Sequence, residues 1–478
     1  SGKIFGLIPA AAFGVWGITA FAINLASKHG GFMFIDGYSP FAEYLIEITG
    51  FNFNNYFPSF YPAMALGKWN FIILGLVAVF SFLAVATAKI KRYKILLAVL
   101  GFILSFLVLE FGFRIYYFVH ERQWFGLSPV RTTLSFYDND IFGSALSPSQ
   151  EGWFVPDSKE YFTRIEVNSH GWPDVEHSYE KPDEIYRILI IGDSFVENTQ
   201  VPLEKRFFRQ LQRDLGQKIE VIALGRGNTG TAQQYLILKN FGLKYKPDMV
   251  IQMFFEANDV KNNSPVLQND PYLPYFSLNE NGKLTELPHG KRSERKLSVL
   301  KDLIKKFRVT EFLLFLRQKS IEKEANYKTG YPADYHVYDL DLPRDYSDAW
   351  EVTKKLLDET RKETERAGAK YMLIAFPGNE AVQKDVQERI VKTYPEFDPK
   401  KISFDRPEKI LGEFCRLKKI DCRFMLSFFA DYMNSNPGAR LYNFYEGHWT
   451  QAGTDLTADF ITEVFSSLPQ FRQSLLSR

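Results

Sequence analysis

Residues that hold metal ions are scarce in this chain of 478 residues, which has two cysteines and seven histidines. The cysteines, Cys415 and Cys422, lie in the stretch CRLKKIDC, with neither a CxxC motif nor a His/Cys cluster. This pattern excludes a zinc site built on thiolates, and we expect neither a metal nor a cofactor. The spacing leaves open whether the two cysteines form a disulfide or remain two buried thiols.

A strong net charge is also lacking, because 58 basic residues oppose 56 acidic ones and the formal net charge is +2. Without a basic or acidic field over the whole chain, nothing indicates a nucleic-acid partner. Aromatic residues, in contrast, make up 16% of the chain. Such a high content favours contact with a membrane.

Long apolar runs are present, and they are concentrated in the first quarter of the sequence. Residues 4–26, 69–88 and 95–119 are each long enough to cross a bilayer as a helix, and only the third contains charged residues. The first run fits a signal peptide poorly, and the two later runs would in any case remain in the mature chain. We therefore expect residues 1–119 to form a membrane region with three transmembrane helices.

The orientation of this region follows from one basic loop. Residues 89–94, KIKRYK, separate the second run from the third and carry four positive charges. Basic loops stay on the cytoplasmic side of a membrane. The sequence therefore predicts that everything after residue 119 lies outside the cytoplasm.

The C-terminal part alternates apolar strands with helices. Residues 120–180 are expected to connect the membrane region to a domain over 181–478, with one short strand on the way. Continuously apolar strands separated by helices indicate a parallel sheet that is buried on both faces. The fold class is thus α/β, a three-layer α/β/α domain interrupted by an inserted subdomain at 264–345. The expected strands are 186–192, 219–224, 248–255, 369–377 and 420–425, and the expected helices are 203–215, 231–242, 347–367, 378–394, 406–419 and 450–466.

Polar residues follow the strands where a parallel sheet binds its ligands. The first strand ends in Gly-Asp-Ser, with Ser194, and the second runs into a glycine-rich turn at 225–230. Asn258 follows the third strand, and Glu446 and His448 precede the last helix. Each feature alone has a structural explanation, since a serine at the start of a helix is often only its cap.

Together these residues supply the groups for acyl transfer through a serine ester. Ser194 would be the nucleophile, His448 the base that takes its proton, and Glu446 the carboxylate that orients the imidazolium. A developing oxyanion needs donors placed in advance. The backbone N–H of Ser194, an N–H from the 225–230 turn and the amide of Asn258 are the candidates.

The four blocks GDSF, GRGNTG, AND and EGHWTQAG resemble those of the SGNH hydrolases, also called the GDSL esterase family. The stretch VNSHGW…KPDEIYRILIIGDSF is similar to a bacterial, membrane-anchored subgroup. The likeness covers about residues 160–466, apart from the insertion. It implies a flavodoxin-like sheet, with Ser194 as nucleophile, His448 as base and Asn258 as an oxyanion donor.

The sequence departs from the family pattern at three positions. The oxyanion glycine of the second block aligns with Asn228, with Gly227 as the neighbouring candidate. Ala257 stands where a glycine is usual before the third-block asparagine, and Glu446 replaces the usual aspartate. Besides these three, Glu197 and Asn198 follow the serine at positions where related sequences often have small residues.

Three functions remain open. The first is a membrane-anchored esterase that hydrolyses acyl esters outside the cytoplasm. The second is an O-acyltransferase that modifies an envelope glycan together with an integral-membrane partner, since three spans exceed what an anchor needs. The third is a degenerate subunit with a structural role in a membrane assembly. The expected location is the bacterial cytoplasmic membrane, and the expected ligands are an acyl ester of a glycan or lipid and membrane lipid itself.

Overall fold

The computed structural model describes the C-terminal part of the chain. From residue 132 onward, the described residues belong to a unit made of Arg131–Lys296 and Gln318–Arg478. The described residues are 132–156, 160–290, 330–469 and 471, together with 101, 103, 106, 107 and 110.

The predicted membrane spans largely lie outside these residues. Nothing of 4–26 and 69–88 is described, and only five positions of 95–119 are. The basic loop 89–94 is also outside. In the part of the chain that the structure describes, no helix is both long and apolar enough to cross a membrane.

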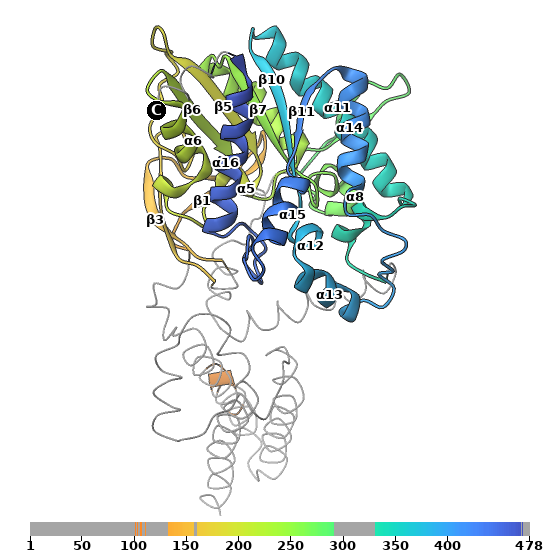
Figure 1. Cartoon of the computed structure of the whole chain (residues 1–478). Helices are drawn as coiled ribbons and strands as arrows, with labels where there is room; N and C mark the ends of the chain where they lie inside the picture. Colours follow the sequence, from red (N-terminus) through yellow and green to blue (C-terminus); the bar gives the residue numbers. More distant parts are fainter. Residues whose placement is uncertain are drawn as a thin grey trace, which may run out of the picture. The chain divides into compact units, whose positions relative to one another are not determined.

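Five strands form a parallel central sheet in the order β11-β10-β7-β5-β6 (Figure 1). They correspond to the five predicted apolar strands. β6 lies on one side of β5 and β7 on the other, so the chain reverses direction across the sheet beside β5. Ligands bind at such a switch point, beyond the carboxyl ends of the strands. The bounds are β5 (Tyr186–Gly192), β6 (Ile219–Gly225), β7 (Met249–Phe255), β10 (Lys370–Phe376) and β11 (Asp421–Phe424).

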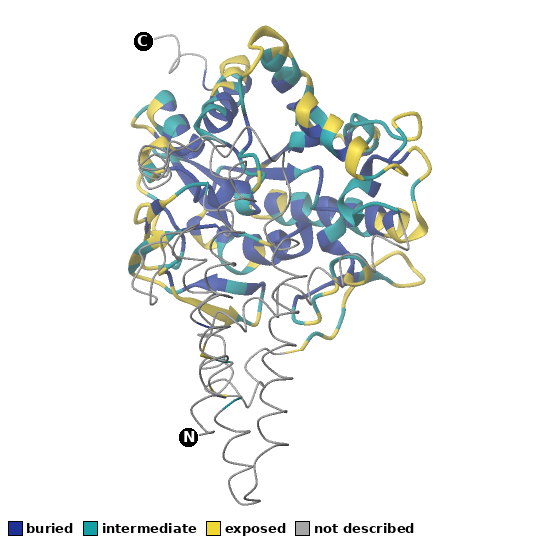
Figure 2. Ribbon diagram, turned by 90° about the horizontal axis from the view of Figure 1, so that it is seen from below, coloured by how far each residue is buried: buried dark blue, intermediate teal, exposed yellow. Residues whose placement is uncertain are grey.

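Helices cover both faces of the sheet, as the α/β/α prediction requires. Alternate strand side chains enter different cores, with Ile188 and Ile190 in one and Leu189 and Ile191 in the other. Figure 2 shows the strands as the buried centre and the exposed residues on the periphery. The first core is closed by α6 (Phe207–Leu215), α15 (Leu426–Ser435) and α16 (Gln451–Ser467), and the second by α7 (Thr231–Asn240), α11 (Arg344–Arg366) and α14 (Arg406–Lys418).

Several shorter elements differ from the prediction. The expected helix over 378–394 is two helices, because Gln383 adopts an extended backbone between them. α15 was not predicted, and the segment expected to hold one short strand contains four. The further elements are α8 (Pro265–Gln268), α12 (Asn379–Val382), α13 (Lys384–Thr393) and three antiparallel pairs: β1 (Phe136–Asn139) with β2 (Gly143–Leu146), β3 (Gln150–Phe154) with β4 (Thr163–Val167), and β8 (Phe276–Leu278) with β9 (Leu284–Glu286).

The two cysteines form a disulfide, which settles the alternative that the sequence left open. Cys415 lies in α14 and Cys422 in β11. The bond therefore ties the edge strand of the sheet to the helix that precedes it. Disulfides persist in oxidising compartments.

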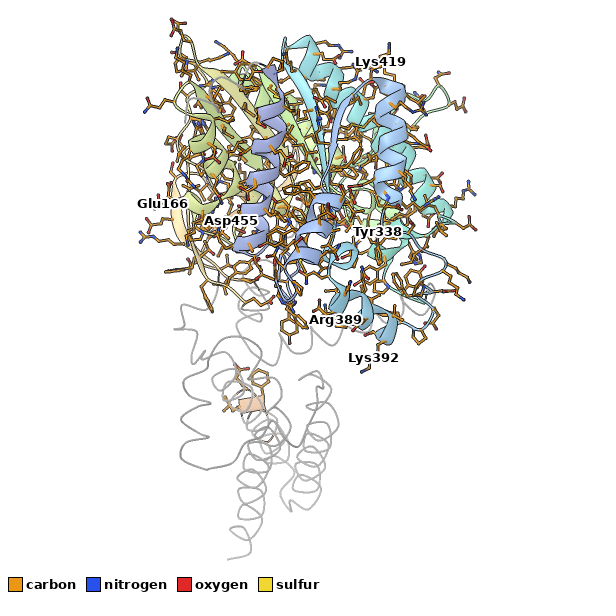
Figure 3. The ribbon with its side chains drawn as sticks, viewed as in Figure 1. Glu166, Tyr338, Arg389, Lys392, Lys419 and Asp455 are labelled. Carbon is orange, nitrogen blue, oxygen red and sulfur yellow. A yellow bond between two sulfur atoms is a disulfide. The ribbon has the colours of Figure 1, made fainter. Side chains whose placement is uncertain are left out.

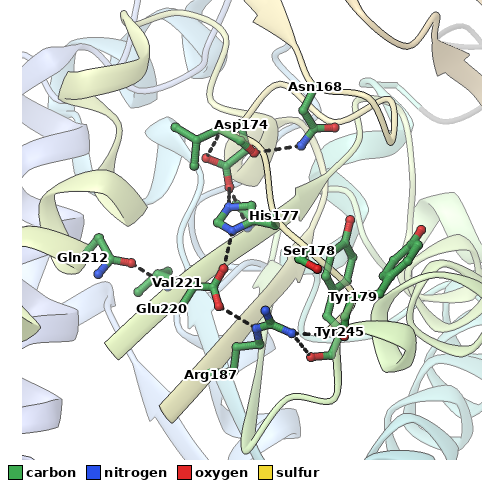
Figure 4. Close-up of polar contacts among 12 residues, drawn as sticks. Asn168, Asp174, His177, Ser178, Tyr179, Arg187, Gln212, Glu220, Val221 and Tyr245 are labelled. Atoms are coloured by element: carbon green, nitrogen blue, oxygen red, sulfur yellow. Dashed lines mark hydrogen bonds and ion pairs between the residues drawn. The ribbon is translucent and has the colours of Figure 1, made fainter. Parts of the chain in front are cut away.

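A buried charge network attaches the segment before β5 to the sheet (Figure 4). His177 contacts Asp174 at 3.2 Å and Glu220 of β6 at 2.7 Å, and Glu220 accepts the Nε–H of Arg187 at 2.6 Å. Burial alone would lower the pKa of His177, but the two carboxylates hold that pKa above its ordinary value. Asp174 also pairs with Arg209 at 3.3 Å, so each carboxylate of the network faces a guanidinium, which lowers the cost of burying its charge.

Candidate active site

Ser194, His448 and Glu446 lie together at the carboxyl end of the sheet. Ser194 opens the short helix α5 (Ser194–Glu197) directly after β5. Its Oγ lies 2.5 Å from Nε2 of His448, whose Nδ1 lies 2.6 Å from Oε1 of Glu446. Oε2 of Glu446 also accepts the backbone N–H of His448 at 3.1 Å. This geometry can pass a proton from a serine hydroxyl to an imidazole that a carboxylate orients.

Asp193, and not Ser194, is the cap of α5. Its Oδ1 accepts the N–H of Phe195 at 3.0 Å, and the residue is only 1% exposed. The aspartate therefore caps the helix. The serine hydroxyl is not needed for capping and contacts His448. Burial raises the pKa of Asp193 to about 6, against the opposing effects of the Phe195 N–H, His448 and the Asn258 amide.

Aromatic rings pack against the imidazole of His448. The ring of Phe195 lies under that of His448, with centroids 4.6 Å apart, and the next residue, Trp449, is fully buried. The side chain of His448 keeps 23% of its surface exposed, so a substrate can reach it. Burial would lower the pKa of His448, but the adjacent Glu446 carboxylate, with Asp193 and Glu197 behind it, holds the pKa above 6.5.

The turn after β6 packs tightly against α5. A Cβ atom on Gly225 would come within 2.0 Å of the backbone nitrogen of Glu197, so only glycine allows this approach. Glu197 is 6% exposed and pairs through Oε1 with Arg226, while Oε2 accepts the N–H of Gly227 at 2.8 Å. The unusual glutamate after the serine therefore fixes the turn in place.

This arrangement distinguishes the two candidate oxyanion donors of the turn. The N–H of Gly227 is engaged by Glu197. Asn228 has a left-handed backbone, with φ of 61°, which asparagine tolerates better than most residues. Its side chain accepts a hydrogen bond from Gln268, and its N–H donates to no described residue. Asn228 is thus the donor that stays available in the turn.

Asn258 follows β7 and lies next to the nucleophile loop. Its amide is among the groups that lower the pKa of Asp193, which immediately precedes the nucleophile. The next residue, Asp259, is fully buried and accepts the N–H of Phe255 at 3.0 Å and the amide of Gln234 at 3.1 Å. Burial, reinforced by the nearby Asp193, raises the pKa of Asp259 well above its usual range.

Two residues at the site were not predicted from the sequence. Glu160 accepts three backbone N–H groups from Phe444, Tyr445 and Glu446, and after burial the Glu446 carboxylate is the next cause that raises the pKa of Tyr161. Both lie in the turn between β3 and β4. No local signal marks them, because their partners lie more than 280 residues away in the sequence.

Within residues 132–156, 160–290, 330–469 and 471, no group of three or more His, Cys, Asp or Glu side chains is placed to hold a metal ion. Two carboxylates at the strand ends accept hydrogen bonds instead, Asp193 from the N–H of Phe195 and Asp259 from the N–H of Phe255.

Comparisons with known proteins find likenesses at the level of structure. No family model and no curated sequence matches the chain. The acetyl xylan esterase AlAXEase is 11% identical over 58% of this chain and 98% of its own, with a TM-score of 0.33. A lipase/acylhydrolase from Enterococcus faecalis is 12% identical over 59% and 95%, with a TM-score of 0.30. A catalytic mutant of Axe2, an acetylxylan esterase from Geobacillus stearothermophilus, has the same identity, coverage and TM-score. At these identities and scores the likeness assigns no activity to this chain.

Proposed function

We propose that this chain is a membrane-anchored serine esterase of the SGNH type that acts on acyl esters outside the cytoplasm. The observation that carries the proposal is the 2.5 Å contact between Ser194 Oγ and His448 Nε2, with Glu446 against the other ring nitrogen. Residues from two separate parts of the chain, the loop before α16 and the start of α5, converge there without a structural need for the serine hydroxyl, because Asp193 already caps α5.

In the proposed mechanism, Ser194 Oγ attacks the carbonyl carbon of the ester while its proton passes to Nε2 of His448. Glu446 stabilises the imidazolium that forms. The tetrahedral oxyanion is met by the N–H groups of Ser194 and Asn228 and by the amide of Asn258, which act as preorganised donors.

Collapse of this intermediate breaks the ester bond, and His448 gives its proton to the leaving alcohol oxygen. The acyl group then remains on Ser194. Water attacks the acyl-enzyme, loses its proton to His448, and the same proton returns to Ser194 Oγ when the free acid leaves. If a sugar hydroxyl attacks in place of water, the same groups catalyse acyl transfer.

The membrane anchor and the location are part of the proposal. They are supported by the apolar runs at 4–26, 69–88 and 95–119, by the basic loop at 89–94 and by the Cys415–Cys422 disulfide. The same three runs favour the transferase as second candidate, because an anchor needs only one. Its acceptor would be an envelope glycan, and its partner an integral-membrane protein that supplies the acyl group.

A fluorophosphonate probe, which reacts with activated serines, tests the proposal on the full chain. We expect labelling of the wild type, no labelling of Ser194→Ala or His448→Ala, and full labelling of Ser347→Ala, an exposed serine in the first turn of α11. Absence of labelling in the wild type would favour the degenerate structural subunit. With an active protein, acyl transfer to a sugar that exceeds release of free acid would select the transferase.

A further inference from the structure

The loop that carries Glu446 is held from outside the α/β core. Oε1 of Glu160 accepts the N–H of Phe444 at 2.7 Å, and Oε2 accepts those of Tyr445 at 2.9 Å and Glu446 at 2.7 Å. Three successive N–H groups thus point at one carboxylate, an arrangement that binds anions well.

The loop cannot satisfy these groups itself. Its internal bonds close the turn, from the N–H of Asn443 to the carbonyl of His448 at 2.7 Å and from the N–H of Gly447 to the carbonyl of Asn443 at 3.1 Å. Tyr445, at the tip, is 46% exposed, and the loop is otherwise held through the ring of Phe444, whose centre lies 4.3 Å from the guanidinium of Arg389 and 5.0 Å from that of Arg440. Glu160 is therefore a main attachment of the backbone that places Glu446.

Tyr161 acts on the side chain of the same residue. Its hydroxyl lies close enough to the Glu446 side chain for that carboxylate to act on it, and its ring stacks on Phe154 of β3, with centroids 6.2 Å apart. Burial, followed by the charges of Glu446, Glu197 and Glu160, raises the pKa of Tyr161 far above its usual value, so the hydroxyl stays protonated and can donate to Glu446.

We propose that Glu160 and Tyr161 are positioning residues of the catalytic site, with Glu160 fixing the backbone of Glu446 and Tyr161 fixing its carboxylate. The β3–β4 hairpin is then a part of the active site and not merely a connection. This inference rests on the proposed function, because it assigns Glu446 the task of orienting His448.

The two residues have opposite effects on His448. Without Glu160 the loop loosens, the imidazole loses its carboxylate, and the pKa of His448 falls. Without the Tyr161 hydroxyl, the full charge of Glu446 faces the imidazole, and the pKa rises. Asp193 and Glu197, the other charged groups facing His448, are unchanged in both cases.

The test uses the full chain with Glu160→Ala, Glu160→Gln and Tyr161→Phe. Matched controls are Glu166→Ala, an exposed residue of β4 (Figure 3), and Tyr137→Phe, an exposed tyrosine of β1.

For p-nitrophenyl acetate hydrolysis, we expect kcat to fall about 100-fold in Glu160→Ala, as for a misplaced catalytic group. Glu160→Gln, which keeps one accepting oxygen, should lie between it and the wild type. Tyr161→Phe should lose about tenfold, the worth of one hydrogen bond to a charged group.

The pKa of His448 is measured separately, from the pH dependence of its modification by diethylpyrocarbonate, followed by mass spectrometry of the peptide that contains it. We expect a lower pKa in Glu160→Ala, a higher one in Tyr161→Phe and wild-type values in both controls. An unchanged pKa in Tyr161→Phe, a small substitution that should preserve the fold, would overturn the proposal. This measurement needs no turnover. If the wild type does not hydrolyse the ester, the proposed esterase function is refuted, but the pKa of His448 in the variants still tests the positioning role of Glu160 and Tyr161.

Discussion

Removal of the charge on Glu197 tests how the turn after β6 is held against the nucleophile. The Glu197 carboxylate pairs with the guanidinium of Arg226, and the two side chains are only 6% and 9% exposed. The remaining contacts of Arg226 are weaker: its Nε–H donates to the Ser144 carbonyl at 2.7 Å, and its guanidinium lies 5.1 Å from the ring centre of Phe136. In Glu197→Gln, the guanidinium would remain buried without its counter-charge.

Loss of one partner from a buried ion pair costs about 3–5 kcal/mol. For a folded unit of this size, that free energy corresponds to a fall in Tm of roughly 6–10 °C. The turn also carries the Asn228 N–H, and loss of one oxyanion donor lowers kcat by about 10²–10³. We expect both effects, with a much smaller change in KM.

Circular-dichroism melting and ester hydrolysis measure the two effects. The double variant Glu197→Gln/Arg226→Gln should regain more than half of the lost stability, because no buried charge is then unpaired, but it should stay slow. Glu166→Gln, on the exposed face of β4, is the control and should melt like the wild type. The reasoning is refuted if Glu197→Gln costs less than about 1 kcal/mol, as an exposed pair would, or if the double variant is no more stable than the single one.

Three further predictions concern pH and the disulfide. His448 must be neutral to act as a base, and its pKa is raised, so kcat/KM should fall on the acid side with a midpoint above pH ~6.5. A midpoint below that value in a pH–rate profile would contradict Glu446 as the partner of His448. Glu256 is fully buried, and burial together with the nearby Glu408 raises its pKa. The folded state therefore favours the protonated carboxyl, and the free energy of unfolding decreases as the pH rises and Glu256 must ionise. Glu256→Gln should therefore raise Tm at pH 8 and change it little at pH 5, whereas equal shifts at both values would exclude this titration. Replacing Cys415 and Cys422 together by serine should lower the free energy of unfolding by about 2–3 kcal/mol, as expected for a short closed loop; unchanged denaturant midpoints would show that the bond adds no stability.

The strands and their polar ends could be predicted because they depend on local sequence. The strand before Ser194 is continuously apolar from Ile188 to Ile191, which suits a strand buried on both faces, and it ends at the glycine and aspartate that follow. Since carboxyl ends of parallel strands share one edge of a sheet, Ser194 and Asn258 were expected to lie close together, with His448 brought to them by the final helix. The sheet order and the 2.5 Å contact between Ser194 and His448 agree with this expectation.

Other features depended on contacts between distant parts of the chain, and only the tertiary structure decided them. Whether Asp193 or Ser194 capped the helix depended on which side-chain oxygen met the Phe195 N–H. The choice of Asn228 over Gly227 depended on the direction in which Glu197 points. The support of Glu446 by Glu160 joins residues 286 positions apart, and no periodicity or motif encodes such a pairing. The sequence by itself thus determined which groups stand at the strand ends, whereas packing determined which of their hydrogen bonds are occupied and which remain free for a substrate.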